Sequence, residues 1–188
     1  PLAKAIVAYL GEKNIRNPII IAHSFGGRIA TLLTGYYKEK IDKMILIDSA
    51  GIKRHKKLKI WLKEKIYKIL KQIKKILPKK SKEKYHKKLQ KIFGSNDYKA
   101  LSPNMQETFK NVINEDLKYY LPYIDSETLL IWGEQDQDTP LKDGILMHKK
   151  IKNSALIVYP KATHYSYLEY SNLTINIIEK FLLEEKDS

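Results

Sequence analysis

The sequence contains no cysteine, so disulfide bonds and thiolate metal sites are excluded. It also lacks long hydrophobic runs: no apolar stretch approaches the roughly 20 residues that a membrane-spanning helix needs. The absence of cysteine fits a reducing compartment, and we predict a cytoplasmic location. What remains is ordinary for a globular protein, because 43% of the 188 residues are apolar and can form a core.

Acidic residues are nearly absent from one part of the chain. The net charge is +14, and residues 52–91 hold 18 lysines and arginines against two glutamates, a local charge of +16. The rest of the chain has 17 basic and 19 acidic residues, or −2. The sequence therefore predicts a near-neutral globular body that carries one strongly basic insert.

Residues 18–30 change from a strand pattern to a helix pattern within a few positions. Ile19–Ile21 is a β-branched apolar run, typical of a strand that is buried on both faces, and apolar residues at helical spacing follow Gly26. Ser24 stands between the two patterns, with the small residues Ala22 and Gly26 two positions to either side. A turn this sharp requires a strained backbone at its central residue, and large neighbouring side chains would collide there.

The segment Ala22-His23-Ser24-Phe25-Gly26-Gly27 resembles the nucleophile elbow of the α/β-hydrolase fold, with Ala22 in place of the commoner first glycine. The resemblance implies a protein of the α/β class, with a parallel sheet flanked by helices and a helical cap inserted into it. It also implies that Ser24 is the nucleophile. The alternative is an ordinary tight turn in another α/β protein.

The pattern along the chain agrees with this fold class. Further strands are expected over residues 43–48, 128–132 and 155–159, and helices over residues 2–12, 25–37, 140–151 and 173–183. Alternating buried strands and amphipathic helices predict a parallel sheet that is covered on both faces. Ser24, Asp48, Asp136 and His164 each follow a strand, so we expect them at one edge of the sheet.

A serine hydroxyl needs a base to remove its proton, and the base is usually a histidine held by a carboxylate. Among the five histidines, only His164 follows the last strand on a loop. The others have positions less suited to this role, since they lie beside the serine, in the lysine-rich segment or in a helix: His23, His55, His86 and His148. We therefore predict His164 as the base.

Two aspartates are candidates for the acid. The segment from Leu129 to Asp136, followed by Thr139-Pro140, resembles the acid-bearing segment of the family, which favours Asp136. Asp138 is expected to face solvent. Asp48 is the alternative acid, because some members of this fold carry the acid after the preceding strand, and it otherwise would bond loop amides.

The oxyanion of an acyl-transfer reaction needs two backbone donors. The family resemblance implies the N–H of Phe25 as the first, and an early His-Gly loop, which this sequence does not contain, as the second. The resemblance covers Pro1–Ile52 and residues 125–183. We therefore expect a fragment of low activity, in which the strand before Ser24 is an exposed, aggregation-prone sheet edge.

The predicted domains are a core formed by residues 1–51 and 122–188 and a cap formed by residues 52–121. Within the cap, apolar residues recur at helical spacing between Leu58 and Ile76, while lysines occupy most other positions. This basic surface is either simply solvated, or binds anionic membrane lipid, or binds nucleic acid. Nucleic acid is disfavoured because aromatic residues are few there.

Together these features predict a serine hydrolase that acts on a small ester-like or other acyl substrate through Ser24, His164 and Asp136 and an acyl-enzyme. The rival prediction is a non-catalytic protein of the same fold whose basic cap binds a membrane or nucleic acid. No cofactor is expected, and no metal site, because no ligand-type spacing accompanies His164 and Asp136. The sequence does not indicate an oligomeric state.

Overall fold

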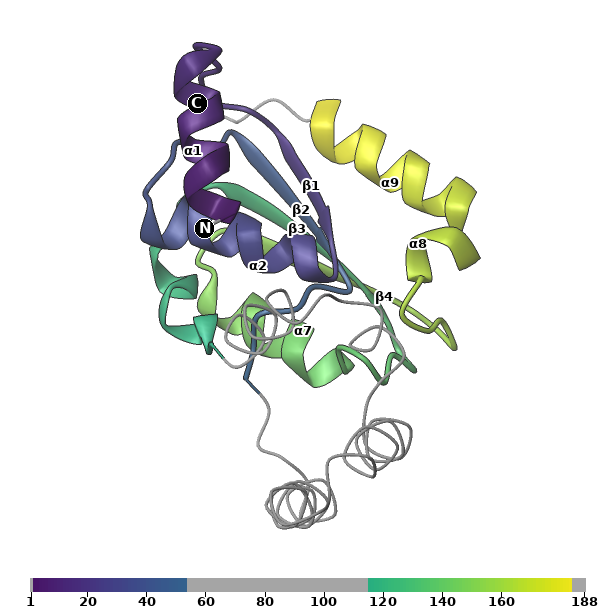
Figure 1. Ribbon diagram of the computed structural model, residues 1–188. Helices are drawn as coiled ribbons and strands as arrows, with labels where there is room; N and C mark the ends of the chain where they lie inside the picture. Colours follow the sequence, from purple (N-terminus) through teal and green to yellow (C-terminus); the bar gives the residue numbers. More distant parts are fainter. Residues whose placement is uncertain (1, 54–114, 184–188) are drawn as a thin grey trace, which may run out of the picture. The chain divides into compact units, whose positions relative to one another are not determined.

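The computed structural model describes residues 2–53 and 115–183 (Figure 1). Of these, residues 2–53 and 116–183 belong to one compact unit. Most of the predicted cap, including its basic segment with His55 and His86, lies outside the described residues. The domain boundaries and the partners expected for the cap therefore stay predictions.

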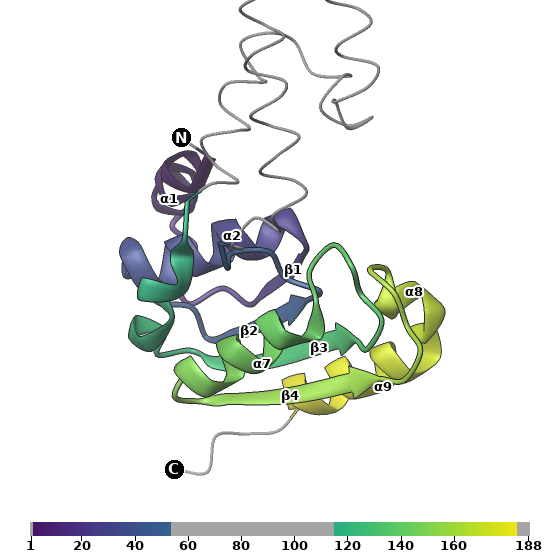
Figure 2. The same cartoon turned by 90° about the horizontal axis from the view of Figure 1, so that it is seen from below.

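The compact unit is built on a four-stranded parallel sheet in the order β1-β2-β3-β4. The strands are β1 (Ile20–His23), β2 (Lys43–Ile47), β3 (Glu127–Gly133) and β4 (Ser154–Tyr159). All three neighbouring pairs are parallel, which confirms the predicted sheet. The carboxyl ends of all four strands consequently lie at the same edge (Figure 2).

Helices cover both faces of this sheet, and most of them have the predicted bounds. They are α1 (Leu2–Glu12), α2 (Phe25–Thr31, continued by a π-helical turn Leu32–Tyr36), α7 (Leu141–Lys150), α8 (Ser166–Glu169) and α9 (Ser171–Leu183). Two short 3₁₀ helices, Leu117–Tyr119 and Leu121–Tyr123, precede β3. Helices α2 and α7 lie on one face and α8 and α9 on the other (Figures 1 and 2).

The two central strands explain why the core has two layers. Successive side chains of a strand point to opposite faces, so Met44 and Leu46 pack with α7 while Ile45 and Ile47 pack with α9. Every residue of β2 is buried, including Lys43, whose Nζ donates to the Phe181 carbonyl at 2.6 Å. Burial of each aliphatic side chain of β2, such as Ile45 or Leu46, stabilises the fold by about 1.5–3 kcal/mol.

The first strand differs from the prediction that it is buried on both faces. Ile19 is 47% exposed and Ile21 is 56% exposed. In the described residues β1 pairs only with β2, and the core cluster that contains Ile45, the partner of Ile21, has no member from β1. The expected exposed sheet edge is thus present, and burial on both faces is wrong for this strand.

Part of the apolar face of α1 is exposed. Helical spacing puts Leu2, Ile6, Tyr9 and Leu10 on one face, yet Leu2 and Tyr9 are 56% and 54% exposed. The residue that is buried is Ala3, because the helix contacts α2 and the π-helical turn through a neighbouring face.

Among the described residues, no helix combines the length and apolar character needed to cross a bilayer.

Candidate active site

Ser24 occupies the junction between β1 and α2, and its backbone is strained as the sequence predicts. Its dihedral angles are φ 49° and ψ −114°, in a region that residues other than glycine rarely adopt. The Ser24 carbonyl accepts hydrogen bonds from the N–H groups of Gly27 (3.0 Å) and Ala50 (2.9 Å), and the Ser24 N–H donates to the Ile47 carbonyl (3.0 Å). These bonds fasten the strained turn to β2 and to the loop that follows it.

Small residues allow this turn to pack closely. A Cβ atom at Gly27 would lie only 2.7 Å from the Cβ of Ser49 and still closer to its Oγ, so this position requires glycine. A Cβ atom at Gly26 would lie 3.5 Å from that of Ala22, which is an ordinary van der Waals contact. The turn is therefore compatible with small residues on both sides of Ser24.

His164 lies on the loop between β4 and α8, and both of its ring nitrogens have side-chain partners. Nδ1 is 2.8 Å from Oδ2 of Asp136, and Nε2 is 2.9 Å from Oγ of Ser24. Because an ionised carboxylate only accepts hydrogen bonds, Nδ1 carries the proton in the neutral ring, and the bare Nε2 accepts from the serine hydroxyl. The structure thus brings together the serine, histidine and aspartate that the sequence analysis selected.

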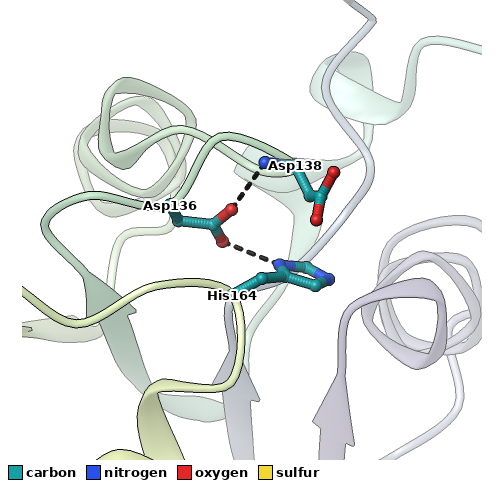
Figure 3. A group of neighbouring side chains, drawn as sticks. All are labelled: Asp136, Asp138 and His164. Carbon is teal, nitrogen blue, oxygen red and sulfur yellow. Dashed lines mark hydrogen bonds and ion pairs between the residues drawn. The ribbon is translucent and has the colours of Figure 1, made fainter.

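Asp136 is held by its own loop after β3. One oxygen, Oδ1, accepts hydrogen bonds from the backbone N–H groups of Asp138 (2.7 Å) and Thr139 (2.8 Å), which leaves Oδ2 for His164. Figure 3 shows this carboxylate between the imidazole ring and the Asp138 amide. Asp136 is only 4% exposed, whereas Asp138 is exposed, as predicted.

Thr139 was not predicted as part of the site. Its Oγ lies 2.6 Å from Oδ2 of Asp136, 2.9 Å from the Asp48 carbonyl oxygen and 3.3 Å from Nδ1 of His164. The sequence signal was present, because Thr139 belongs to the acid-bearing segment, but its contacts depend on how the loop folds back.

Asp48, the alternative acid, is fully buried and bonds other partners. Oδ1 accepts from the N–H of Gly133 (2.8 Å), and Oδ2 accepts from the N–H (3.2 Å) and the hydroxyl (2.6 Å) of Ser166. Burial raises the pKa of Asp48, the hydrogen bonds from Ser166 and Gly133 oppose the rise, and the nearby Asp136 charge adds to it. This carboxylate therefore holds the loops around the site, and its hydrogen bonds within the described residues join it to Gly133 and Ser166 rather than to His164.

The remaining predicted residues have these positions. His23 is directed away from the serine hydroxyl, because its Nε2 lies 2.8 Å from the backbone carbonyl oxygen of His164. His148 is exposed on α7, with Nδ1 3.0 Å from Oγ of Ser154. Phe25 is the first residue of α2 and directly follows Ser24, so its backbone N–H lies next to the serine in the chain.

Three of these side chains also have the composition of a metal site. Asp136, Asp138 and His164 present ligand atoms that all lie within 4.8 Å of one another. However, the Asp136 carboxylate already accepts bonds from His164, Thr139 and its own loop, and a metal ion on Nδ1 of His164 would have to replace a proton. The cluster is explained more simply as a hydrogen-bonded carboxylate and imidazole beside an exposed aspartate.

Known proteins are similar to this chain in sequence. A family model described as the alpha/beta hydrolase fold matches residues 2–170. The chain is 31% identical over 197 residues to the pimeloyl-[acyl-carrier protein] methyl ester esterase of Wigglesworthia glossinidia brevipalpis. The aligned region covers 94% of this chain and 74% of that protein. It is 25% identical over 182 residues to the uncharacterized hydrolase YugF of Bacillus subtilis (strain 168), covering 87% of this chain and 64% of that one.

Solved structures have the same fold at lower identity. An esterase from Exiguobacterium antarcticum superposes with a TM-score of 0.64 at 22% identity, over 95% of this chain and 71% of that chain. A bromoperoxidase from Bacillus anthracis gives a TM-score of 0.68 at 14% identity, over 97% of this chain and 73% of that one. With its parallel sheet, its strained serine turn and the match over residues 2–170, the chain belongs to the alpha/beta hydrolase fold family.

Proposed function

We propose that this protein is a serine hydrolase that acts on ester-like acyl substrates, with Ser24 as nucleophile, His164 as base and Asp136 as acid. The observation that carries the proposal is one continuous chain of hydrogen bonds. It runs from Ser24 Oγ to His164 Nε2 (2.9 Å) and from His164 Nδ1 to Asp136 Oδ2 (2.8 Å). Both distances are within the range that proton transfer and ring orientation require.

The proposed reaction follows from these contacts. As Ser24 Oγ attacks the substrate carbonyl carbon, its proton passes to Nε2 of His164, and the Asp136 carboxylate stabilises the imidazolium through the Nδ1 proton. The carbonyl oxygen becomes an oxyanion that accepts a hydrogen bond from the Phe25 N–H. His164 then gives its proton to the departing alcohol, and the acyl group stays on Ser24 as an acyl-enzyme. A water molecule, activated by His164 in the same way, hydrolyses that ester.

Asp136 is proposed as the acid in preference to Asp48 because of the partner of each carboxylate. A carboxylate that orients a base must bond the nitrogen opposite the reacting one, and Asp136 does so at 2.8 Å. The Asp48 oxygens are instead occupied by Gly133 and Ser166.

A methyl ester of an acyl chain is the first substrate class to test, since one relative is named as an esterase of such a compound. The fold itself does not choose between ester, thioester, amide and carbon–carbon substrates. The second oxyanion donor and the cytoplasmic location stay predictions.

The decisive experiment replaces Ser24 with alanine. We expect the hydrolysis of short nitrophenyl and methyl esters to fall about 10⁴-fold or more, and labelling by a fluorophosphonate probe to disappear. Ser154→Ala is the matched control, because this serine starts β4 at the opposite edge of the sheet. Equal turnover and labelling in the Ser24 variant and the wild type would refute the proposal.

A second function is proposed for the basic segment, on the basis of its charge alone. Residues 52–91 carry a net charge of +16, and a basic amphipathic helix binds anionic membrane surfaces. If so, vesicles with anionic lipid sediment the protein at low salt, whereas neutral vesicles do not. Equal binding to both vesicle types would exclude this function, and binding only to polynucleotides would favour the nucleic-acid alternative.

A further inference from the structure

The loop that carries His164 has to cross the whole sheet to meet Ser24. Ser24 follows β1 and His164 follows β4, and these two strands are at opposite ends of the strand order β1-β2-β3-β4. Neighbouring strands lie about 4.8 Å apart, so the ends of β1 and β4 are separated by roughly 14 Å. The loop after β4 therefore needs anchors along the way, or its imidazole would occupy many positions.

Anchors are present where the loop passes the two central strands. At β3, the N–H of Gln135 donates to the Ala162 carbonyl at 2.8 Å. Gly133 lets the loop approach closely, since a Cβ atom there would lie 2.7 Å from that carbonyl oxygen. At β2, the carboxylate of Asp48 accepts two hydrogen bonds from Ser166.

The anchor at β1 is the side chain of His23, which precedes the nucleophile directly. Its Nε2 lies 2.8 Å from the backbone carbonyl oxygen of His164. A carbonyl oxygen can only accept a hydrogen bond, so Nε2 of His23 must carry a proton. The two imidazole rings lie 5.0 Å apart, which leaves the edge of His164 free for Ser24.

We propose, on the basis of the function proposed above, that His23 is a positioning residue that keeps His164 within proton-transfer distance of Ser24. It does so by donating its Nε2 proton to the His164 carbonyl. This bond differs from the contact between Ser24 and His164, which is lost whenever Ser24 Oγ is acylated and has no proton to donate. During that stage the hydrogen bonds that the described residues still provide to His164 are those to Asp136, Thr139 and His23.

The proposal predicts which kinetic constant depends on His23. Loss of the anchor affects chiefly the hydrolysis of the acyl-enzyme, when Ser24 no longer helps to hold the base. Because small misplacements of catalytic groups cost up to about 100-fold in rate, we expect kcat to fall about 10- to 100-fold. The Michaelis constant should fall or stay level, since slower deacylation does not weaken substrate binding. The initial burst of released nitrophenol should remain.

Two variants separate the hydrogen bond from the space that the ring fills. His23→Phe keeps a ring and removes the donor, whereas His23→Gln places an amide N–H near the position of Nε2. We expect the low kcat in the phenylalanine variant and recovery to within about threefold of wild type in the glutamine variant. Equal rates in the phenylalanine variant and the wild type would overturn the proposal. So would equal losses in both variants, or a raised Michaelis constant at unchanged kcat.

A measurement that needs no turnover keeps this proposal separate from the proposed function. Long-range ¹H–¹⁵N NMR of the imidazole rings should find His23 protonated on Nε2 in the wild type and in Ser24→Ala alike. A His23 ring protonated only on Nδ1 would overturn the proposal. If Ser24→Ala turns over esters as fast as the wild type, the serine mechanism fails. If only the Ser24 variant is impaired, the role of His23 fails alone.

Discussion

Asp48 and Asp136 follow neighbouring strands of one sheet and are both buried, yet their carboxylates have different partners. Asp136 receives two backbone amides on Oδ1 and presents Oδ2 to the imidazole of His164. Asp48 receives the Gly133 amide on Oδ1 and the amide and hydroxyl of Ser166 on Oδ2. The same residue type at equivalent strand ends therefore orients a side chain in one case and holds loop backbone in the other.

The difference lies in the loop conformations. After β3 the chain turns back so that the amides of Asp138 and Thr139 reach Oδ1 of Asp136, while Oδ2 bonds the side chains of Thr139 and His164. Asp48 has a left-handed backbone (φ 43°), and its carboxylate reaches across to β3 and to α8. A carboxylate near an active site is thus assigned its role by the donors that surround each oxygen.

The most severe test of this comparison is Asp136→Asn. The amide would present either an N–H group or a poorer acceptor to His164, so the ring loses the protonation pattern that leaves Nε2 bare. We expect kcat to fall by about 10³- to 10⁴-fold, with a cooperative unfolding transition retained, measured by ester hydrolysis and urea denaturation. A larger loss of kcat in Asp48→Asn than in Asp136→Asn would reverse the two assignments.

Asp48→Asn should act mainly on stability. An asparagine at this buried position cannot accept all three hydrogen bonds, so one donor from Gly133 or Ser166 loses its partner. We expect the free energy of unfolding to fall by about 1–3 kcal/mol, measured by urea denaturation at neutral pH. The kcat should fall far less than for Asp136→Asn, and unchanged stability would contradict the holding role.

A smaller effect is expected in the pH dependence of that stability difference. The pKa of Asp48 in the folded protein lies above its ordinary value of 3.8, with burial as the largest cause. The folded state therefore binds this proton more tightly than the unfolded state. The resulting contribution to stability is complete below pH 3.8 and is lost as the pH rises through the raised pKa.

Urea denaturation of the wild type and of Asp48→Asn across this range isolates the titration, because other groups largely cancel in the difference. The wild-type free energy of unfolding minus that of the variant should decline as the pH rises from 3.8. A difference that grows with pH would show that the hydrogen bonds from Ser166 and Gly133 outweigh burial.

The local sequence pattern was sufficient to predict those strands whose two faces are both buried. The apolar runs of β2 and β3 predicted their strands almost to the residue, and the range of α9 was predicted to within two residues. The exposed face of β1 is a tertiary property, since it depends on which strands and helices lie beside Ile21. Helix α8 has only four residues, too few to show a period.

In the candidate site, too, some residues were predicted from the local sequence and others depend on the tertiary structure. Ser24, His164 and Asp136 were found from a turn motif, from chain order and from an acid-bearing segment. The roles of Thr139 and His23 were not found, because their hydrogen bonds join residues 25 and 141 positions apart and depend on loop conformation. The sequence likewise left Asp48 as an alternative acid, since only the surrounding donors distinguish it from Asp136.

The strained turn at Ser24 implies a conflict between the stability of the fold and the proposed catalytic role of this residue. Glycine adopts a positive φ without steric cost, so a protein with glycine at position 24 would relieve strain of about 1–3 kcal/mol, less the larger chain entropy that glycine gives to the unfolded state. Selection for heat resistance alone would therefore tend to remove the proposed nucleophile. Efforts to make this protein more robust should leave position 24 unchanged and seek their gains elsewhere in the chain.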